Sequence, residues 1–277
     1  MTAKCVAENN ANSFNNSMLF RFFETDNHEK DMEIARKRIV KGNGNVIFNV
    51  NWIYMNEHST ETLKTVLQNV NDNFCRNKVP ITFNLSSTKR IHKNLTLDML
   101  DCDTNSMLYD AYGDKSPNVL NIFSGTIVDY YLAFSMFPEA GNHTDGVFLG
   151  DMENHNLTMA DWSQALTHEI GHWLGLLHTF QGSCNDTNND YVKDTPAVDF
   201  RPRFQTITPS QKFDINNLVS GTWKSEDNIN SCPLLQGLDL TDNYMDYTTF
   251  KNKFSKGQAF RMMKFAEFRF SIDSTEA

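Results

Sequence analysis

The stretch from His168 to His178, HEIGHWLGLLH, constrains this chain more than any other part of its sequence. Residues four apart on a helix project from the same face, so His168 and His172 can offer ring nitrogens to one metal ion. A straight helix would carry His178 away from that face. Gly175 can adopt the left-handed backbone conformation that most residues avoid, and the resulting turn would bring His178 back as a third ligand. The stretch therefore predicts a helix that ends at Gly175 and a metal site built from three imidazoles.

The number and type of these ligands favour zinc. Three protein ligands leave a fourth position for water, which is typical of catalytic rather than structural zinc sites. Glu169 follows the first ligand directly, where its carboxylate can take a proton from that water as general base. Bound zinc lowers the pKa of water to about 7 and polarises a scissile carbonyl, so these residues predict peptide hydrolysis without a covalent intermediate. The plainer alternative is a buried helix whose histidines only satisfy core hydrogen bonds, but such a motif rarely arises by chance.

Hydrophobic periodicity around this motif predicts an α/β fold. Apolar residues alternate over 46–54, which indicates a strand, and recur at helical spacing over 60–77, after Ser59 as a cap. Further short strands are expected at 81–85, 119–123 and 146–149. The histidine-bearing helix is expected to start with a capping box from Asp161 to Gln164, and a last helix to run from Ser255 to about Phe270. Strands that alternate with helices in this way indicate a sheet covered by helices.

Composition limits the partners of the chain. A net charge of -9 and a pI near 5.3 disfavour nucleic acid and acidic substrates as main partners. No apolar run is long enough to cross a membrane, and the N-terminus lacks the layout of a signal peptide, so the chain is either cytosolic or has lost a leader. Residues 1–40 are polar and indicate a leader or a surface arm. The cysteine count of 5 is odd, so at least one is free, paired between chains or used chemically.

Three motifs together resemble the pappalysin family of metzincin zinc metalloproteases, especially its secreted cytophagalysin-type branch. They are HEIGHWLGLLHTFQG from His168, DTP at 194–196 and NYMDY at 243–247. The resemblance implies a metzincin-type catalytic domain over 41–277, with a twisted mixed sheet in an upper subdomain (about 41–178). The active-site helix would lie above an irregular lower subdomain (about 179–277). Residues 1–40 would be a leader or the remnant of a pro-segment.

The same resemblance assigns roles to residues outside the zinc motif. It implies that Met245 forms an apolar floor under the histidines and that Tyr247 assists the transition state. The alternative for Tyr247 is that it only packs beneath the helix and has no catalytic role. It also implies that the segment 145–149 is the edge strand above the cleft, to which an extended protein or peptide substrate would add as an antiparallel strand.

Cysteines and acids of the irregular segment are interpreted through the resemblance as well. Cys184 and Cys232 are expected to form a disulfide, with free thiols as the alternative, and a disulfide favours an oxidising compartment and secretion. Calcium is expected in the loop that follows Cys184, although acid-rich loops are more often simply solvated; the candidate ligands are Asp186, Asp190, Asp194 and Thr195. Cys5 could act as a switch whose thiolate takes the fourth zinc position. Alternatively Cys5 lies in a disordered tail or bridges to Cys75 or Cys102, and Cys75 could also pair with Cys102.

The sequence thus predicts a secreted, zinc-dependent endopeptidase with Glu169 as general base. The alternative is an inactive metzincin-like protein that binds other proteins through the cleft. A third hypothesis is a zinc hydrolase that acts on a non-peptide amide.

Overall fold

The computed structural model describes residues 45–92, 95–128, 132–137, 144–153, 157–185, 190–199, 230–248 and 251–272. The predicted N-terminal segment 1–40 lies outside these residues. Elements follow the order β1 (Val46–Tyr54), α4 (Thr60–Arg76), β2 (Ile81–Arg90), α5 (Cys102–Tyr112), β3 (Val119–Gly125), β4 (Ala133–Ser135), β5 (Val147–Gly150), α6 (Met159–Trp173), η1 (Ser183–Asn185) and α9 (Lys256–Ile272). Among the helices described, none is long and apolar enough to cross a membrane.

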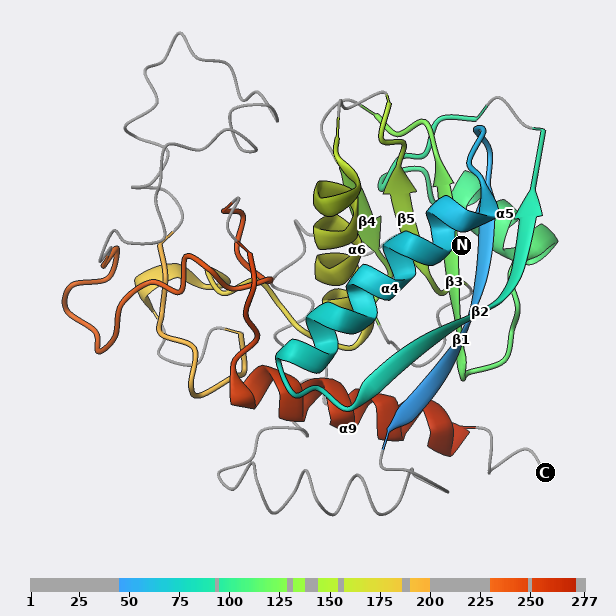
Figure 1. Cartoon of the computed structure of the whole chain (residues 1–277). Helices are drawn as coiled ribbons and strands as arrows, with labels where there is room; N and C mark the ends of the chain where they lie inside the picture. Colours follow the sequence, from blue (N-terminus) through green and yellow to red (C-terminus); the bar gives the residue numbers. More distant parts are fainter. Residues whose placement is uncertain are drawn as a thin grey trace, which may run out of the picture.

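The strands form one mixed sheet in the order β2-β1-β3-β5-β4, which confirms the predicted fold class (Figure 1). The pairs between β2, β1, β3 and β5 are parallel, and only β4 runs antiparallel to its neighbour β5. The prediction that 145–149 is the edge strand is therefore wrong, because β5 lies between β3 and β4. The edge is β4, whose three residues are too few to show a strand pattern in the sequence.

Both faces of the sheet are buried. Along β1, Trp52 belongs to the hydrophobic core shared with α4, α6 and α9, whereas the next residue, Ile53, belongs to a second cluster that includes Leu108 of α5. Successive strand residues point to opposite faces, so this alternation divides the two cores. In Figure 1, α4 and α6 lie on one face of the sheet and α9 runs beneath them. The helix that carries His168 and His172, α6, thus packs on the sheet beside α4, with α9 running beneath both.

Helix caps explain where the helices begin. The Ser59 side chain accepts a hydrogen bond from Thr62 N at 3.0 Å, as the sequence predicted for α4. Ser255 and Gln258 form the predicted capping box of α9, with Gln258 N donating to Ser255 Oγ and Ser255 N donating to Gln258 Oε1. For α6 the predicted box was wrong. Its cap is Thr158, and Asp161 is the third helical residue, whose side chain accepts from Thr158 N at 2.9 Å.

Candidate metal centre

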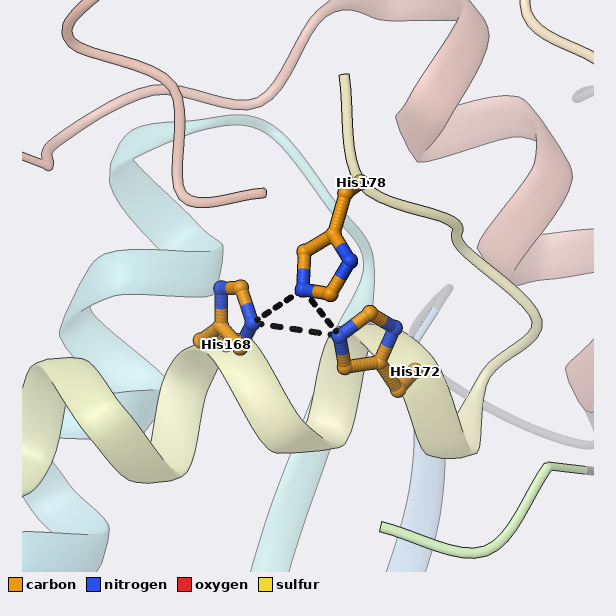
Figure 2. A group of neighbouring side chains, drawn as sticks. All are labelled: His168, His172 and His178. Atoms are coloured by element: carbon orange, nitrogen blue, oxygen red, sulfur yellow. Dashed lines mark hydrogen bonds between the residues drawn. The ribbon is translucent and has the colours of Figure 1, made fainter. Parts of the chain in front are cut away.

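Three histidine side chains converge at the C-terminal end of α6 (Figure 2). His168 and His172 lie one helical turn apart, and their Nε2 atoms are 3.1 Å apart. The Nε2 atom of His178 lies 3.2 Å from that of His168 and 3.1 Å from that of His172. Nitrogens arranged tetrahedrally around zinc at about 2.0–2.1 Å lie about 3.3–3.4 Å from one another, so the three atoms are spaced to hold such an ion. No other such group of His, Cys, Asp or Glu occurs within the described residues.

The second ring nitrogens of this cluster fix the tautomers of two ligands. His168 Nδ1 lies 2.6 Å from the carbonyl oxygen of Tyr244, and His172 Nδ1 lies 2.8 Å from that of Leu176. A carbonyl oxygen can only accept, so each Nδ1 carries the proton and donates it. The Nε2 atoms of His168 and His172 are then left with lone pairs, and lone pairs directed at one point repel unless a cation lies between them. The donor set therefore fits a metal ion.

Burial keeps these histidines uncharged. Desolvation lowers the pKa of His172 to about 4, against a smaller opposing effect of its hydrogen bond to Leu176. Desolvation also puts the pKa values of His168 and His178 well below the usual range, and the positive charge of Lys251 lowers them further. Neutral imidazole is the form that binds metals, so the site is prepared for an ion near neutral pH.

Two glycines allow this arrangement. Gly175 has a φ of +81°, and a Cβ there would overlap the ring of Phe265. Its left-handed conformation ends the helix after Trp173 and turns the chain so that His178 faces the other two histidines. Gly171 lies between the two helical ligands, and a Cβ on it would overlap Met245 Sδ. The absence of a side chain at Gly171 lets the segment around Met245 approach α6 directly.

The turn around Met245 is tied to the metal site by its backbone. Met245 is fully buried and accepts a hydrogen bond from Thr179 N at its carbonyl oxygen (3.1 Å). The Asn243 side chain accepts from Met245 N at 2.8 Å and also pairs with Gln258 of α9. Met245 thus packs against α6 at Gly171, and its role as a floor under the histidines stays a prediction.

Glu169 and Tyr247 lie close to the ligands. Glu169 follows His168 on α6 and is 7% exposed. The ring of Tyr247 meets that of His178 edge-on, with centroids 4.6 Å apart, and lies 5.9 Å from the ring of His168. The structure therefore brings both residues to the metal site, although they are far apart in the sequence.

Three residues at the site had not been singled out by sequence reasoning. Phe180 stacks on His178 with centroids 4.7 Å apart, and Phe137 meets His172 edge-on at 5.2 Å. Lys251 Nζ lies 6.0 Å from the centroid of the Tyr247 ring. Of the three, only Phe180 could have been predicted from the sequence, because it follows His178 by two residues. The other two reach the site through tertiary contacts.

The cysteines are distributed as follows. Cys184 and Cys232 form a disulfide with a Cα–Cα distance of 5.4 Å, as the resemblance implied. Cys102 is also disulfide-bonded, whereas Cys75 is free and exposed, so the alternative pair Cys75–Cys102 is not formed. Cys5 lies outside the described residues.

The proposed calcium ligands lie in different settings. Asp190 is buried and accepts from Thr195 Oγ1 at 2.8 Å and from Val192 N at 3.0 Å. Desolvation raises the pKa of Asp190 to about 7. Asp194 instead accepts from Ser255 Oγ and Gly257 N, at the start of α9. Asp186 lies outside the described residues, and calcium stays a prediction.

Comparison with known proteins agrees with this geometry. A peptidase family described as pregnancy-associated plasma protein-A matches residues 132–267. An extracellular metalloprotease of Sordaria macrospora is 40% identical over 118 residues, which are 42% of this chain and 32% of that protein. An extracellular metalloprotease of Verticillium alfalfae is 31% identical over 193 residues, which are 66% of this chain and 61% of that protein. The matches thus span only part of each relative.

A solved structure shares the fold. A mutant of promirolysin from Tannerella forsythia superposes with a TM-score of 0.62 at 19% identity, covering 99% of both chains. The chain thus shares the metzincin-type fold of promirolysin and has a three-histidine site of the kind that a metalloprotease needs. Residues 132–267, which include the three histidines, are similar to the pappalysin family of peptidases.

Proposed function

We propose that this chain is a secreted zinc-dependent endopeptidase that hydrolyses proteins or peptides. The observation that carries the proposal is the convergence of three Nε2 atoms within 3.1–3.2 Å of one another, beside a buried glutamate. Two of the three rings donate a hydrogen bond from Nδ1–H to a backbone carbonyl oxygen, which is how metal-binding histidines are usually oriented. Zinc bound by His168, His172 and His178 would lower the pKa of a water to about 7 and polarise the scissile carbonyl.

Glu169 and Tyr247 supply the remaining chemistry in this proposal. The Glu169 carboxylate takes the proton of the attacking water and passes it to the leaving amine. Tyr247 donates its hydroxyl proton in a hydrogen bond to the oxygen that becomes negative in the transition state. The edge-on contact of Tyr247 with His178 supports this role, because it holds the phenol ring next to a ligand.

The substrate is proposed to bind as an extended strand. Since β4 and not β5 forms the edge of the sheet, the main-chain groups of β4 are the ones that could pair with a peptide. Phe137, two residues beyond the end of β4, contacts the ring of His172. This contact supports a path for the peptide along β4 toward the metal.

Secretion is supported by two observations. The relatives are named extracellular metalloproteases, and the chain has a disulfide between Cys184 and Cys232. Disulfides persist mainly in oxidising compartments. In the same proposal, residues 1–40 are a leader or pro-segment and residues 41–277 are the catalytic domain.

The test is the digestion of a denatured chromogenic protein by the wild-type chain, by Glu169→Gln and by the wild-type chain with a chelator. The wild-type chain should digest the protein, lose activity with the chelator and regain it with zinc. Glu169→Gln should keep zinc but lose activity, because an amide cannot accept the proton. Near-wild-type turnover of this variant would refute the mechanism. An inactive wild-type chain that holds zinc would favour the alternatives, a protein-binding relative or a hydrolase of another amide.

A further inference from the structure

A lysine lies beside the metal site without a role in the chemistry proposed above. Lys251 is only partly exposed, and its Nζ lies 6.0 Å from the centroid of the Tyr247 ring. That ring in turn contacts the ring of His178. The lysine is therefore one aromatic ring away from a metal ligand.

Hydrogen bonds hold the backbone directly after Lys251. Asn252 N and Lys253 N both donate to the carbonyl oxygen of Asp242, at 2.8 and 3.0 Å. Tyr244 N donates to the carbonyl oxygen of Lys253 at 2.8 Å. On the other side, the Asn77 side chain at the end of α4 donates to Asn252 O at 3.0 Å. Contacts on both sides thus hold the residues directly after Lys251, which limits where its side chain can reach.

The charge of Lys251 acts on the site. Burial lowers its pKa to about 8, while the carboxylates of Asp246 and Glu169 act in the opposite direction, so the amine remains largely protonated at neutral pH. The same charge lowers the pKa of each of the three histidines. The Lys251 charge thus acts on Glu169, Asp246 and the three histidines.

Within the described residues, the Lys251 ammonium makes no hydrogen bond or ion pair. Two carboxylates influence this ammonium electrostatically. Asp246 is fully buried and accepts a hydrogen bond from Thr179 Oγ1 at 3.2 Å. Glu169 is the general base of the proposed mechanism. A partly desolvated ammonium without a partner carries an energetic cost that an incoming carboxylate would remove. The surroundings of Lys251 thus suit an anionic ligand.

We propose that Lys251 binds a carboxylate of the substrate within two residues of the scissile bond and thereby favours cleavage next to acidic groups. The inference rests on the proposed peptidase function and names its substrate preference. The carboxylate could belong to an Asp or Glu side chain or to the C-terminus of a short peptide, since both offer the same group. The net charge of -9 disfavours acidic partners over the whole surface, but a cation within about one Debye length of the scissile bond acts locally.

The test uses a set of peptides that differ only in charge. One series carries Glu, Gln or Lys at each of the two positions on either side of the cleaved bond. A second series compares a free with an amidated C-terminus close to that bond. Each series is measured as kcat/KM with the wild-type chain, Lys251→Met, Lys251→Glu and Lys253→Met. Lys253 is the matched control, because its side chain is 66% exposed and pairs with Asp242.

The wild-type chain should prefer Glu over Gln at one position, or the free over the amidated terminus, by about tenfold or more. Lys251→Met should abolish that preference, Lys251→Glu should shift it toward Lys, and Lys253→Met should leave it unchanged. The series in which the preference appears identifies the source of the carboxylate. Equal cleavage of all peptides by the wild-type chain would overturn the inference, as would a loss in Lys251→Met that is the same for every peptide.

A binding measurement separates this inference from the proposed function. If the wild-type chain cleaves no peptide, the proposed function fails. The same fluorescent peptides can then be titrated onto the zinc-loaded wild-type chain and onto Lys251→Met. Tighter binding of acidic peptides that depends on Lys251 would support the carboxylate site, and equal affinities would refute it.

Discussion

A buried ion pair between Arg269 and Asp145 offers the sharpest test of how the metal-binding helix is held. The Arg269 guanidinium donates to both carboxylate oxygens of Asp145, at 2.9 and 3.0 Å, and to the carbonyl oxygen of Trp173 at 3.1 Å. Its Cζ atom lies 3.7 Å from the centroid of the Trp173 ring. The Trp173 indole also donates to Asp145 at 2.8 Å. The pair thus joins α9 to the last residue of α6, next to His172.

The expected effect of Arg269→Met follows from burial. The two side chains are 7% and 23% exposed, so the substitution leaves a largely buried carboxylate without its cation. Breaking a buried pair in this way costs about 3–5 kcal/mol, and the partial exposure of Asp145 favours the lower end. For a domain of this size, about 3 kcal/mol lowers the melting temperature by about 6–12 °C.

The assay is thermal unfolding followed by circular dichroism, with Arg90→Met as the control. Arg90 pairs with Glu57 at 3.1 Å, but these side chains are 37% and 84% exposed, so the control should change stability by less than about 1 kcal/mol. Adding Asp145→Leu to Arg269→Met should restore part of the loss, because it removes the unpaired carboxylate. The reasoning is refuted if Arg269→Met changes stability as little as the control does. It is also refuted if the double variant is clearly less stable than Arg269→Met alone.

Three further predictions concern the metal site and the irregular segment. His178→Ala should lower zinc affinity and activity together, and full zinc occupancy measured by metal analysis would show that the third ligand is wrong. The metal-free chain should lose stability as the pH falls from about 6.5 to about 4. The reason is that the pKa of His172 is about 4 in the folded chain and near 6.5 in the unfolded chain, so the unfolded chain binds more protons over this range. A melting temperature that does not change with pH over this range would contradict the prediction. Millimolar calcium should raise the melting temperature if it binds at Asp190 and Asp194. The increase should be larger above pH 7, since the pKa of Asp190 is about 7 and the ionised carboxylate binds calcium better. An unchanged melting temperature at constant zinc would refute the calcium site.

Local sequence patterns predicted much of the fold. The alternation over β1 and the helical spacing and cap of α4 depend on residues only a few positions apart, and the structure has both elements within a residue of the predicted bounds. The helix α5 was missed, since its sequence CDTNSMLYDAY mixes polar and apolar residues without a clear apolar stripe. The edge strand was misassigned because β4 is defined by its pairing with β5 rather than by its own residues.

The sequence by itself determined the ligand set. His168 and His172 are brought together by the period of the helix, and the left-handed turn at Gly175 needs only a residue without a side chain. These are short-range constraints, so they can be read from neighbouring residues. They predicted the three ligands, and with them a metal site, without knowledge of the rest of the fold.

Tertiary structure alone decided what surrounds those ligands. Met245 reaches Gly171, Tyr247 reaches His178 and Lys251 approaches the same ring only because the sheet, α6 and α9 pack in one arrangement. The contact between Arg269 and Asp145 joins residues 124 positions apart in the chain. Such contacts depend on the mutual packing of all the elements between them, for which no local pattern exists. The candidate metal ligands therefore lie in one short stretch of the sequence, whereas the position of Lys251 near them depends on the whole fold.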